Sequence, residues 1–311
     1  VQHPANDMTT SIVTTHFDYH SIDHNLLKLD ILGHLDPTMI RMLQDLTGID
    51  PLEIPLDSKE VMSLFQNTSA LGIKPEDIGG TKLGALGIPE FGTDFAMQML
   101  MDTKPQYFSD LVRIAGLAHG TDVWLGNAQT LIKEGKATIS TAICTRDDIM
   151  IYLIQKGLDS EESFKIMEMV RKGKVASGKC KEWPEWKQDM IDHGVPDWYI
   201  WSCERIKYMF PKAHAAAYVM MAWRVAYCKV FYPLAYYTAY FSIRATAFDY
   251  EKMAMSPVRL EHYIAEYKAK KAEGTISNTE EDELGVMRIV QEMHARGYEF
   301  TPIDIYKAKA R

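Results

Sequence analysis

From residue 36 onward, apolar residues recur at the spacing of amphipathic helices, between residues that typically start and stop helices. Asp36-Pro37 is a typical start, with Asp as the N-cap and Pro at the first helical position, and Gly48 is a typical end. Thr145-Arg146-Asp147-Asp148 resembles a capping box in which Asp replaces the usual Glu or Gln. Further helices are predicted to begin at Ser58 and Asp159 and to lie near 93–102, 106–118, 126–134, 196–209, 212–231, 233–245, 256–273 and 279–296. This succession predicts a mainly α-helical protein.

The first fifty residues have a different pattern. Residues 11–15 and 26–32 are β-branched or alternate between apolar and polar, which predicts two strands. The predicted fold is therefore a multi-helical domain preceded by a small β-containing segment. On the second strand Asp30 would share a face with Lys28, so it either pairs with that lysine or presents a functional carboxylate to a cleft.

Composition excludes several classes of protein. The 311 residues are 47% hydrophobic and 24% charged, as in ordinary globular proteins, and no run of eighteen apolar residues predicts a membrane span. The polar start without Met carries no secretory signal, so the sequence is interpreted as a fragment of something longer. The cysteines are widely spaced and lack a C-x-x-C pair, which argues against a zinc site or disulfides and favours a reducing cytoplasmic location.

Positive charge is concentrated in the middle of this acidic chain. The formal net charge is -8, yet residues 171–181 contain five cations and no acid. A second cationic segment, residues 207–218, contains interleaved aromatic residues. Local cations with aromatics suit a polyphosphate or a nucleic acid. The alternative is a solvated basic face.

Several positions in and near these segments are candidates for anion binding. Arg146 falls in the first turn of a predicted helix, where it could clamp a phosphate or pair with the neighbouring aspartates. His214 and Tyr218 are four residues apart, so they share a helix face. Together with Lys212 and the small alanines around them, they suit a nucleoside triphosphate, or else a helix that packs tightly through its alanines. Electropositive side chains from separate helices, including Lys172, are expected to converge on one pocket.

Two further clusters of polar residues allow more than one interpretation. His119-Gly120-Thr121 is typical of a structural turn at the end of a helix. His16, Asp18 and His20 would share a strand face, which suits a transition-metal hydrolase or, alternatively, a solvated polar surface.

Five runs of sequence carry a family resemblance. They are LLKLDILGHLDP (26–37), AHGTDVWLGN (118–127), RDDIMIY (146–152), VRKGK (170–174) and KYMFPKAHAAAY (207–218). They resemble the bacterial replicative DNA polymerase III α subunit of the PolC type, a C-family polymerase, and the similarity extends across nearly the whole chain. One departure is Leu35, which stands where the family pattern usually has an acid.

The resemblance implies the end of a palm domain in residues 1–50, helical dNTP-binding fingers in 51–255 and a helical end of the fingers in 256–311. It implies a DNA-directed DNA polymerase whose two Mg²⁺ ions are held by three aspartates, of which Asp30 matches the third. The other two belong to an Asp-x-Asp motif that this sequence lacks, so the chain alone is expected to be inactive.

The resemblance also implies which residues and partners take part. It assigns the incoming dNTP to seven residues, Arg146, Arg171, Lys172, Lys174, Lys212, His214 and Tyr218, with a possible additional pocket at His119, Thr121 and Tyr208. The implied partners are primer–template DNA and, through regions outside this chain, the sliding clamp and other replisome components. The alternative function is a helical nucleic-acid-binding module without catalysis.

Overall fold

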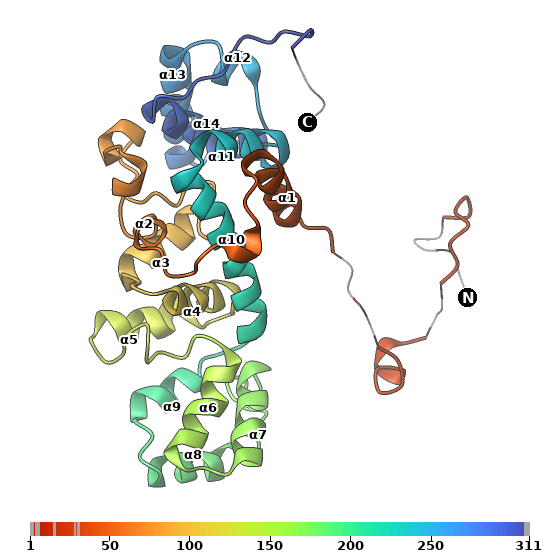
Figure 1. The fold of residues 1–311 in the computed structure, drawn as a ribbon. Coiled ribbons are helices and arrows are strands. Elements are labelled where there is room, and N and C mark those ends of the chain that lie inside the picture. Colours follow the sequence, from red (N-terminus) through yellow and green to blue (C-terminus); the bar gives the residue numbers. More distant parts are fainter. Residues whose placement is uncertain (1–2, 4–6, 15–16, 28, 30–31, 308–311) are drawn as a thin grey trace. The chain divides into compact units, whose positions relative to one another are not determined.

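The computed structural model describes residues 3, 7–14, 17–27, 29 and 32–307. The chain divides into two compact units, residues 1–34 and residues 35–311. The described part of the second unit contains fourteen α-helices (Figure 1). Their bounds are α1 (Asp36–Thr47), α2 (Lys59–Ser63), α3 (Asp94–Thr103), α4 (Phe108–His119), α5 (Gln129–Lys133), α6 (Arg146–Lys156), α7 (Ser160–Arg171), α8 (Trp183–Asp192), α9 (Asp197–Cys203), α10 (Lys212–Phe231), α11 (Pro233–Ala239), α12 (Tyr250–Met253), α13 (Pro257–Glu273) and α14 (Asn278–Ala295). Among the residues described, no helix is long and apolar enough to cross a membrane.

The long helix α10 organises the second unit. It packs against α1, α2, α4 and α11, and Figure 1 shows it running between the α6–α9 helices at one end and α11 at the other. Trp223 on α10 is almost completely buried, stacks on Phe65 at 6.2 Å between ring centroids, and donates from Nε1 to the carbonyl of Pro55 at 2.8 Å. The indole therefore buries a large apolar surface while its one polar atom remains satisfied.

A buried ion pair joins α10 to α14. Nζ of Lys229 lies 2.8 Å from Oε1 of Glu292, and both side chains are fully buried. The ammonium also donates to the carbonyls of Gly84 and Leu86, at 2.8 and 2.6 Å, while the Tyr237 hydroxyl donates to Glu292 at 2.7 Å. Burial lowers the pKa of Lys229, and the adjacent carboxylate opposes that shift. The pair thereby fixes the Gly- and Pro-rich segment before α3 against both helices.

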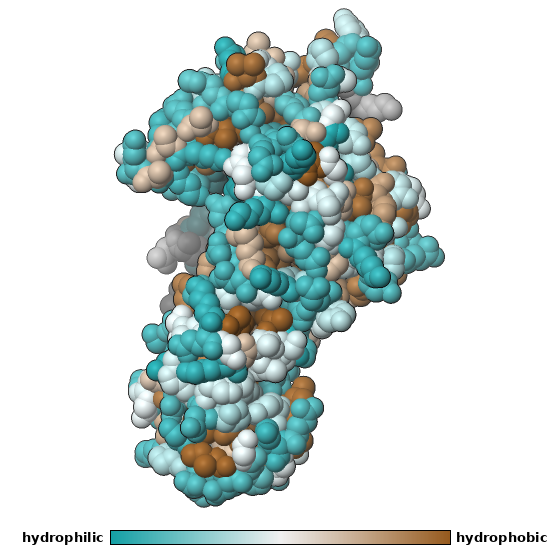
Figure 2. Space-filling view, turned by 90° about the vertical axis from the view of Figure 1, so that its left-hand side faces the viewer, coloured by the Kyte–Doolittle hydropathy of each residue, from teal (hydrophilic) through white to brown (hydrophobic). Residues whose placement is uncertain are grey.

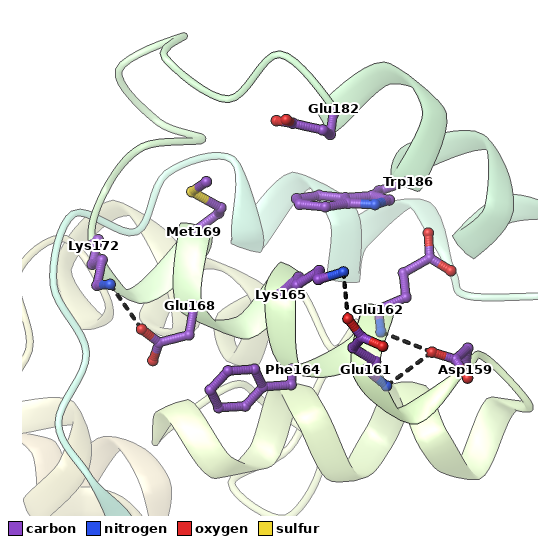
Figure 3. Close-up of a pocket in the computed structure, with 10 residues that line it drawn as sticks. All are labelled: Asp159, Glu161, Glu162, Phe164, Lys165, Glu168, Met169, Lys172, Glu182 and Trp186. Carbon is purple, nitrogen blue, oxygen red and sulfur yellow. Dashed lines mark hydrogen bonds and ion pairs between the residues drawn. The ribbon is translucent and has the colours of Figure 1, made fainter.

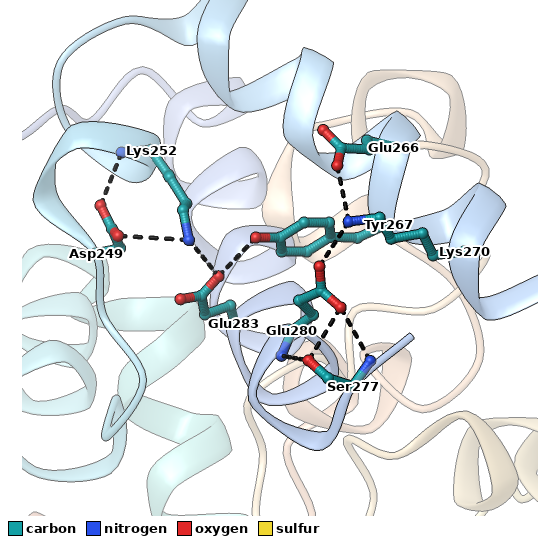
Figure 4. Close-up of polar contacts among 8 residues, drawn as sticks. All are labelled: Asp249, Lys252, Glu266, Tyr267, Lys270, Ser277, Glu280 and Glu283. Carbon is teal, nitrogen blue, oxygen red and sulfur yellow. Dashed lines mark hydrogen bonds and ion pairs between the residues drawn. The ribbon is translucent and has the colours of Figure 1, made fainter. Parts of the chain in front are cut away.

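Charged side chains join α12, α13 and α14 (Figure 4). Glu283 accepts hydrogen bonds from Nζ of Lys252 at 2.7 Å and from the hydroxyl of Tyr267 at 2.9 Å. Glu280 accepts from Nζ of Lys270 at 2.6 Å and from the Ser277 hydroxyl at 2.9 Å, at the start of α14. The contacts of Tyr267 and Lys270 join α13 to α14, which are connected by a short loop, and the contact of Lys252 joins α12 to α14. Together they hold the C-terminal helices in register.

The helices α6 to α9 form a group of their own at the end of α10. Helix α6 packs on α7, and α8 packs on α9. The helix at residues 183–192 is not predicted from the sequence, because α8 is rich in charges and buries only Trp186 and Met190. The face in Figure 2 is mostly hydrophilic with small separate hydrophobic patches, one of which lies over this group.

The prediction of a β-containing segment is not borne out in the described residues. There Thr14 forms a single isolated bridge, Tyr19–Ser21 is one turn of 3-10 helix, and none of the described residues before 35 is buried. A strand needs a neighbour that pairs with its backbone N–H and C=O groups, and no ladder is present here. Residues 15, 28, 30 and 31 of the predicted strands lie outside the described residues.

The predicted start of α1 also needs correction. The N-cap is Leu35, and Asp36 is the first residue of the helix, where it is largely buried. Its carboxylate instead forms an ion pair with Arg244, which follows α11. The predicted end is confirmed, because Gly48 adopts a left-handed conformation with φ of 75° and caps the helix.

Candidate functional site

Helices α6 and α10 begin beside each other. The backbone N–H of Arg146, the first residue of α6, donates to the carbonyl of Phe210 at 3.1 Å. The N–H of Lys212, the first residue of α10, donates to Oδ2 of Asp147 at 2.8 Å. The positive ends of two helix dipoles therefore meet at one place, and each carries a cationic residue at its first position.

The two aspartates of α6 are used structurally at this junction. Oδ2 of Asp148 accepts from the backbone N–H groups of Cys144 and Thr145, at 3.1 and 2.9 Å. Nζ of Lys212 lies 3.6 Å from the other oxygen of Asp148. The half-buried Arg146 has no ion pair or side-chain hydrogen bond to any residue that the structure describes. Its guanidinium therefore remains available for an anion.

A row of four rings runs alongside this junction. His119 at the end of α4 stacks on Phe210 at 4.8 Å, Phe210 and His214 make a T-shaped contact at 4.7 Å, and His214 stacks on Tyr218 at 4.5 Å between centroids. The stack of His214 on Tyr218 follows from their positions one turn apart on α10. His214 is exposed and Tyr218 half-buried, so part of the row faces solvent.

His119 is held at the end of this row by Glu90. The imidazole Nε2 contacts Oε2 of Glu90, and this hydrogen bond raises the pKa of His119 above its usual value, against an opposing effect of burial. Glu90 has a positive φ of 68°, which a residue with a side chain rarely adopts. The contact therefore depends on a backbone conformation that local propensity does not favour.

The two cationic segments predicted from the sequence, residues 171–181 and 207–218, lie side by side. Gly173 of the first packs directly on the second, since a Cβ added to it would lie 2.6 Å from the Lys207 carbonyl oxygen. The second segment also pairs with Thr121, whose N–H donates to the carbonyl of Tyr208 at 2.9 Å and whose carbonyl accepts from the N–H of Lys207 at 3.1 Å. Residues 171–174 and 207–218 are thus in backbone contact although more than thirty residues separate them.

The positive charges of residues 171–174, however, are partly neutralised by a neighbouring acid. Glu168 forms an ion pair with Arg171 and lies 2.9 Å from Nζ of Lys172. These hydrogen bonds lower the pKa of Glu168 to about 2, against the opposing effect of its partial burial. Lys174 is exposed and has no ion pair with any described residue. Among the predicted phosphate ligands, Arg146 and Lys174 are thus the least compensated.

Two residues of the expected single pocket, Lys172 and Lys212, line different cavities. Lys172 lines a cavity of about 640 Å³ between α7 and α8 (Figure 3). Lys212 lines a separate cavity of about 310 Å³ with Arg113, Tyr152 and Trp198. Neither cavity includes Arg146. The backbones of residues 171–174 and 207–218 are in contact, but the side chains of Lys172 and Lys212 line different cavities.

The predicted metal ligand cannot be placed. Asp30 lies outside the described residues, as does His16 of the second metal cluster. Within the described part of the chain, no group of three His, Cys, Asp or Glu side chains could hold a metal ion.

The sequence pattern did not identify Glu90 and Glu168 as neighbours of the site. Glu168 could have been found, because it precedes Arg171 and Lys172 by three and four residues on a predicted helix. Glu90 could not, because its contact with His119 joins distant parts of the sequence.

Helices arranged in this way, with two basic helix starts meeting beside a row of rings, define a helical domain suited to anionic ligands. The chain belongs to the bacterial DNA polymerase III alpha subunit finger domain family, whose model matches residues 36–194, about half of the chain. It is 56% identical over 310 residues to the PolC-type DNA polymerase III of Streptococcus suis, 53% identical to that of Caldanaerobacter subterraneus and 54% identical to that of Clostridium perfringens. These alignments cover the whole chain, and the chain spans about a fifth of the length of these curated relatives.

Proposed function

We propose that this chain is part of a replicative DNA-directed DNA polymerase, in which residues 51–255 bind the incoming dNTP. The observation that carries the proposal is the junction of α6 and α10, where Arg146 and Lys212 start two adjacent helices beside the row of rings. Membership of the finger-domain family supports it.

The triphosphate is assigned to the cationic side of this junction. A guanidinium without a partner can bind two phosphate oxygens at once, which makes Arg146 the principal ligand. Lys212 contributes a point charge that Asp148 holds only weakly, at 3.6 Å, and Lys174 contributes a second from the adjacent segment. Arg171 and Lys172 would contribute only after exchanging Glu168 for phosphate oxygens.

The sugar or base is assigned to the row of rings. His214 and Tyr218 present stacked rings that can pack on a flat ligand without reading its sequence. His119, Thr121 and Tyr208 form the additional pocket at the other end of the row, where Thr121 and Tyr208 are joined through their backbones.

The reaction proposed for the parent protein is template-directed nucleotidyl transfer. The primer 3′ oxygen attacks the α-phosphorus of the dNTP, and pyrophosphate leaves as negative charge grows on its oxygens. Fingers cations that contact the β- and γ-phosphates stabilise that charge most in the transition state. Mg²⁺ bound at Asp30 and at two further aspartates would supply additional charge neutralisation in the parent polymerase. Primer–template DNA is the second ligand, and contacts with a sliding clamp are proposed for other parts of the parent protein.

Calorimetric titration of the chain with a non-hydrolysable dNTP and Mg²⁺ tests this proposal. Arg146→Ala and Lys212→Ala should each weaken binding by about 1.5–3 kcal/mol, as expected for a hydrogen bond to a charged group. Lys133→Ala, at an exposed lysine on α5, is the matched control and should leave the affinity unchanged.

Two outcomes would contradict the assignment. Unchanged affinity in both site variants would remove the junction from dNTP binding. Equal, salt-dependent binding of any DNA without preference for a dNTP would favour a nucleic-acid-binding module. Primer extension by the isolated chain would overturn the separate proposal that it is inactive alone.

A further inference from the structure

A hollow with an apolar floor lies between α7 and α8 (Figure 3). Its volume of about 640 Å³ is within the range of sites that hold organic ligands or peptide side chains. Phe164, Met169 and Trp186 supply its apolar surface. Phe164 is 49% exposed, which is costly for a ring of this size unless another surface covers it.

Carboxylates surround this apolar floor. Five acids and two lysines line the hollow, which gives it a formal charge of -3. Both lysines are already engaged, because Nζ of Lys165 lies 2.7 Å from Glu161 and Nζ of Lys172 lies 2.9 Å from Glu168. The remaining lining acids are Asp159, Glu162 and Glu182.

Glu162 has no ion pair with any described residue, and other carboxylates lie near it. Its pKa is raised by burial and by the neighbouring carboxylates of Asp189, Asp159 and Glu185, which come from both helices. Acids in the first turn of α7 would be explained by the helix dipole alone, but Asp189 lies well inside α8. A cation placed in the hollow would therefore relieve repulsion between helices.

The charge and the apolar surface of the hollow favour one kind of ligand over others. No three carboxylates in the described part of the chain converge as metal ligands do, so the negative charge is spread over the rim. Phosphate backbones would be repelled by it. A chain with several cations and one large apolar side chain would match both the rim and the floor.

We propose that the hollow between α7 and α8 is a docking site for a basic segment of a partner protein, which inserts an aromatic or long aliphatic side chain against Phe164 and Trp186. The flanking lysines or arginines of that segment pair with Glu162 and Glu182. This site is separate from the α6–α10 junction and does not depend on dNTP binding.

The test uses a short fluorescein-labelled peptide with arginines at both ends and one central tryptophan, and fluorescence anisotropy on the whole chain. Saturable binding that weakens as salt rises is expected. Peptides with glutamates for the arginines, or alanine for the tryptophan, should not bind. Hydrogen exchange should show peptide-dependent protection in residues 159–170 and 182–190.

Variants of the chain locate the site. Phe164→Ser removes the exposed ring and Glu162→Lys reverses a charge on the rim, and each should weaken binding at least about tenfold. Glu273→Lys makes the same charge change at an exposed position on α13 and should have no effect. If Phe164→Ser does not fold, Glu162→Lys and Glu182→Lys decide the outcome.

Several results would overturn the proposal. These are the absence of saturable binding, equal weakening by Glu273→Lys, or protection confined to other helices. Sedimentation that shows a dimer dissociated by Glu162→Lys would instead assign the hollow to a second copy of this chain. Displacement of the peptide by stoichiometric Mg²⁺ would make it a cation site.

Discussion

The N–H of Lys212 donates a 2.8 Å hydrogen bond to Oδ2 of Asp147, so a side chain in the first turn of α6 caps the start of α10. Since Pro211 cannot supply a side-chain cap, this carboxylate is what satisfies the first N–H of the longest helix. The same bond sets the distance between the two helix starts. Stability and the candidate site are therefore coupled at one residue.

Asp147→Ala is expected to lower the free energy of unfolding by about 0.5–2 kcal/mol, the usual cost of losing a helix cap. It should also weaken dNTP binding, because Lys212 loses its fixed position relative to Arg146. Asp147→Asn keeps an acceptor oxygen and should retain most of the stability. Urea denaturation together with dNTP titration checks both effects, and an Asp147→Ala protein of unchanged stability would refute the capping role.

Lys229→Met is expected to destabilise the protein by about 3–5 kcal/mol, because it leaves the carboxylate of Glu292 buried without a cation. Replacing both residues, with Lys229→Met and Glu292→Leu, should recover much of that loss since no buried charge remains. Thermal and urea unfolding of the two variants measure the difference. A double variant as unstable as the single one would show that the hydrogen bonds to Gly84 and Leu86 matter more than the ion pair.

Helices with typical start and stop residues at both ends were predictable from the sequence, and the clearest case is α10. Pro211 and Pro233 bracket it, and its observed bounds match the predicted range 212–231. The predicted helix at 126–134 was too long, because Gly126 has a φ of 67° and residues 124–128 form a π-type turn before α5. That irregularity is set by tertiary packing, with Asn127 buried and bonded to Ser202 seventy-five residues away.

Local geometry in the site was also predictable, whereas its long-range contacts were not. The shared face of His214 and Tyr218 follows from helical spacing alone, and their rings do stack. The capping box at Thr145 is only half formed, because Asp148 accepts from the Thr145 N–H but the Thr145 hydroxyl is buried without a partner in the described residues. The contact of Gly173 with Lys207 depends on how α7 returns to α10, which no local pattern specifies.

The ion pairs of Glu168 should make the free energy of unfolding depend on pH. Its pKa falls from an ordinary value of 4.5 to about 2 in the folded protein. The folded state therefore binds fewer protons, so its contribution is complete above pH 4.5 and is lost as the pH falls towards 2. The difference in unfolding free energy between the parent chain and Glu168→Gln should shrink over that range. Glu273→Gln, at an exposed residue of α13, is the control variant.

His119 is expected to titrate above its ordinary pKa of 6.5, because Glu90 stabilises the imidazolium. Since the folded pKa is raised, the stabilisation from this pair is complete below 6.5 and is lost as the pH rises through the folded pKa. Glu90→Gln should return the pKa towards 6.5, as followed by NMR titration of the His119 ring protons. Glu134→Gln, which removes an exposed carboxylate that pairs with Lys136 after α5, should leave the His119 pKa unchanged. If the His119 pKa does not move in Glu90→Gln, the ring is positioned by its stack on Phe210 and the carboxylate has no part in holding its charge.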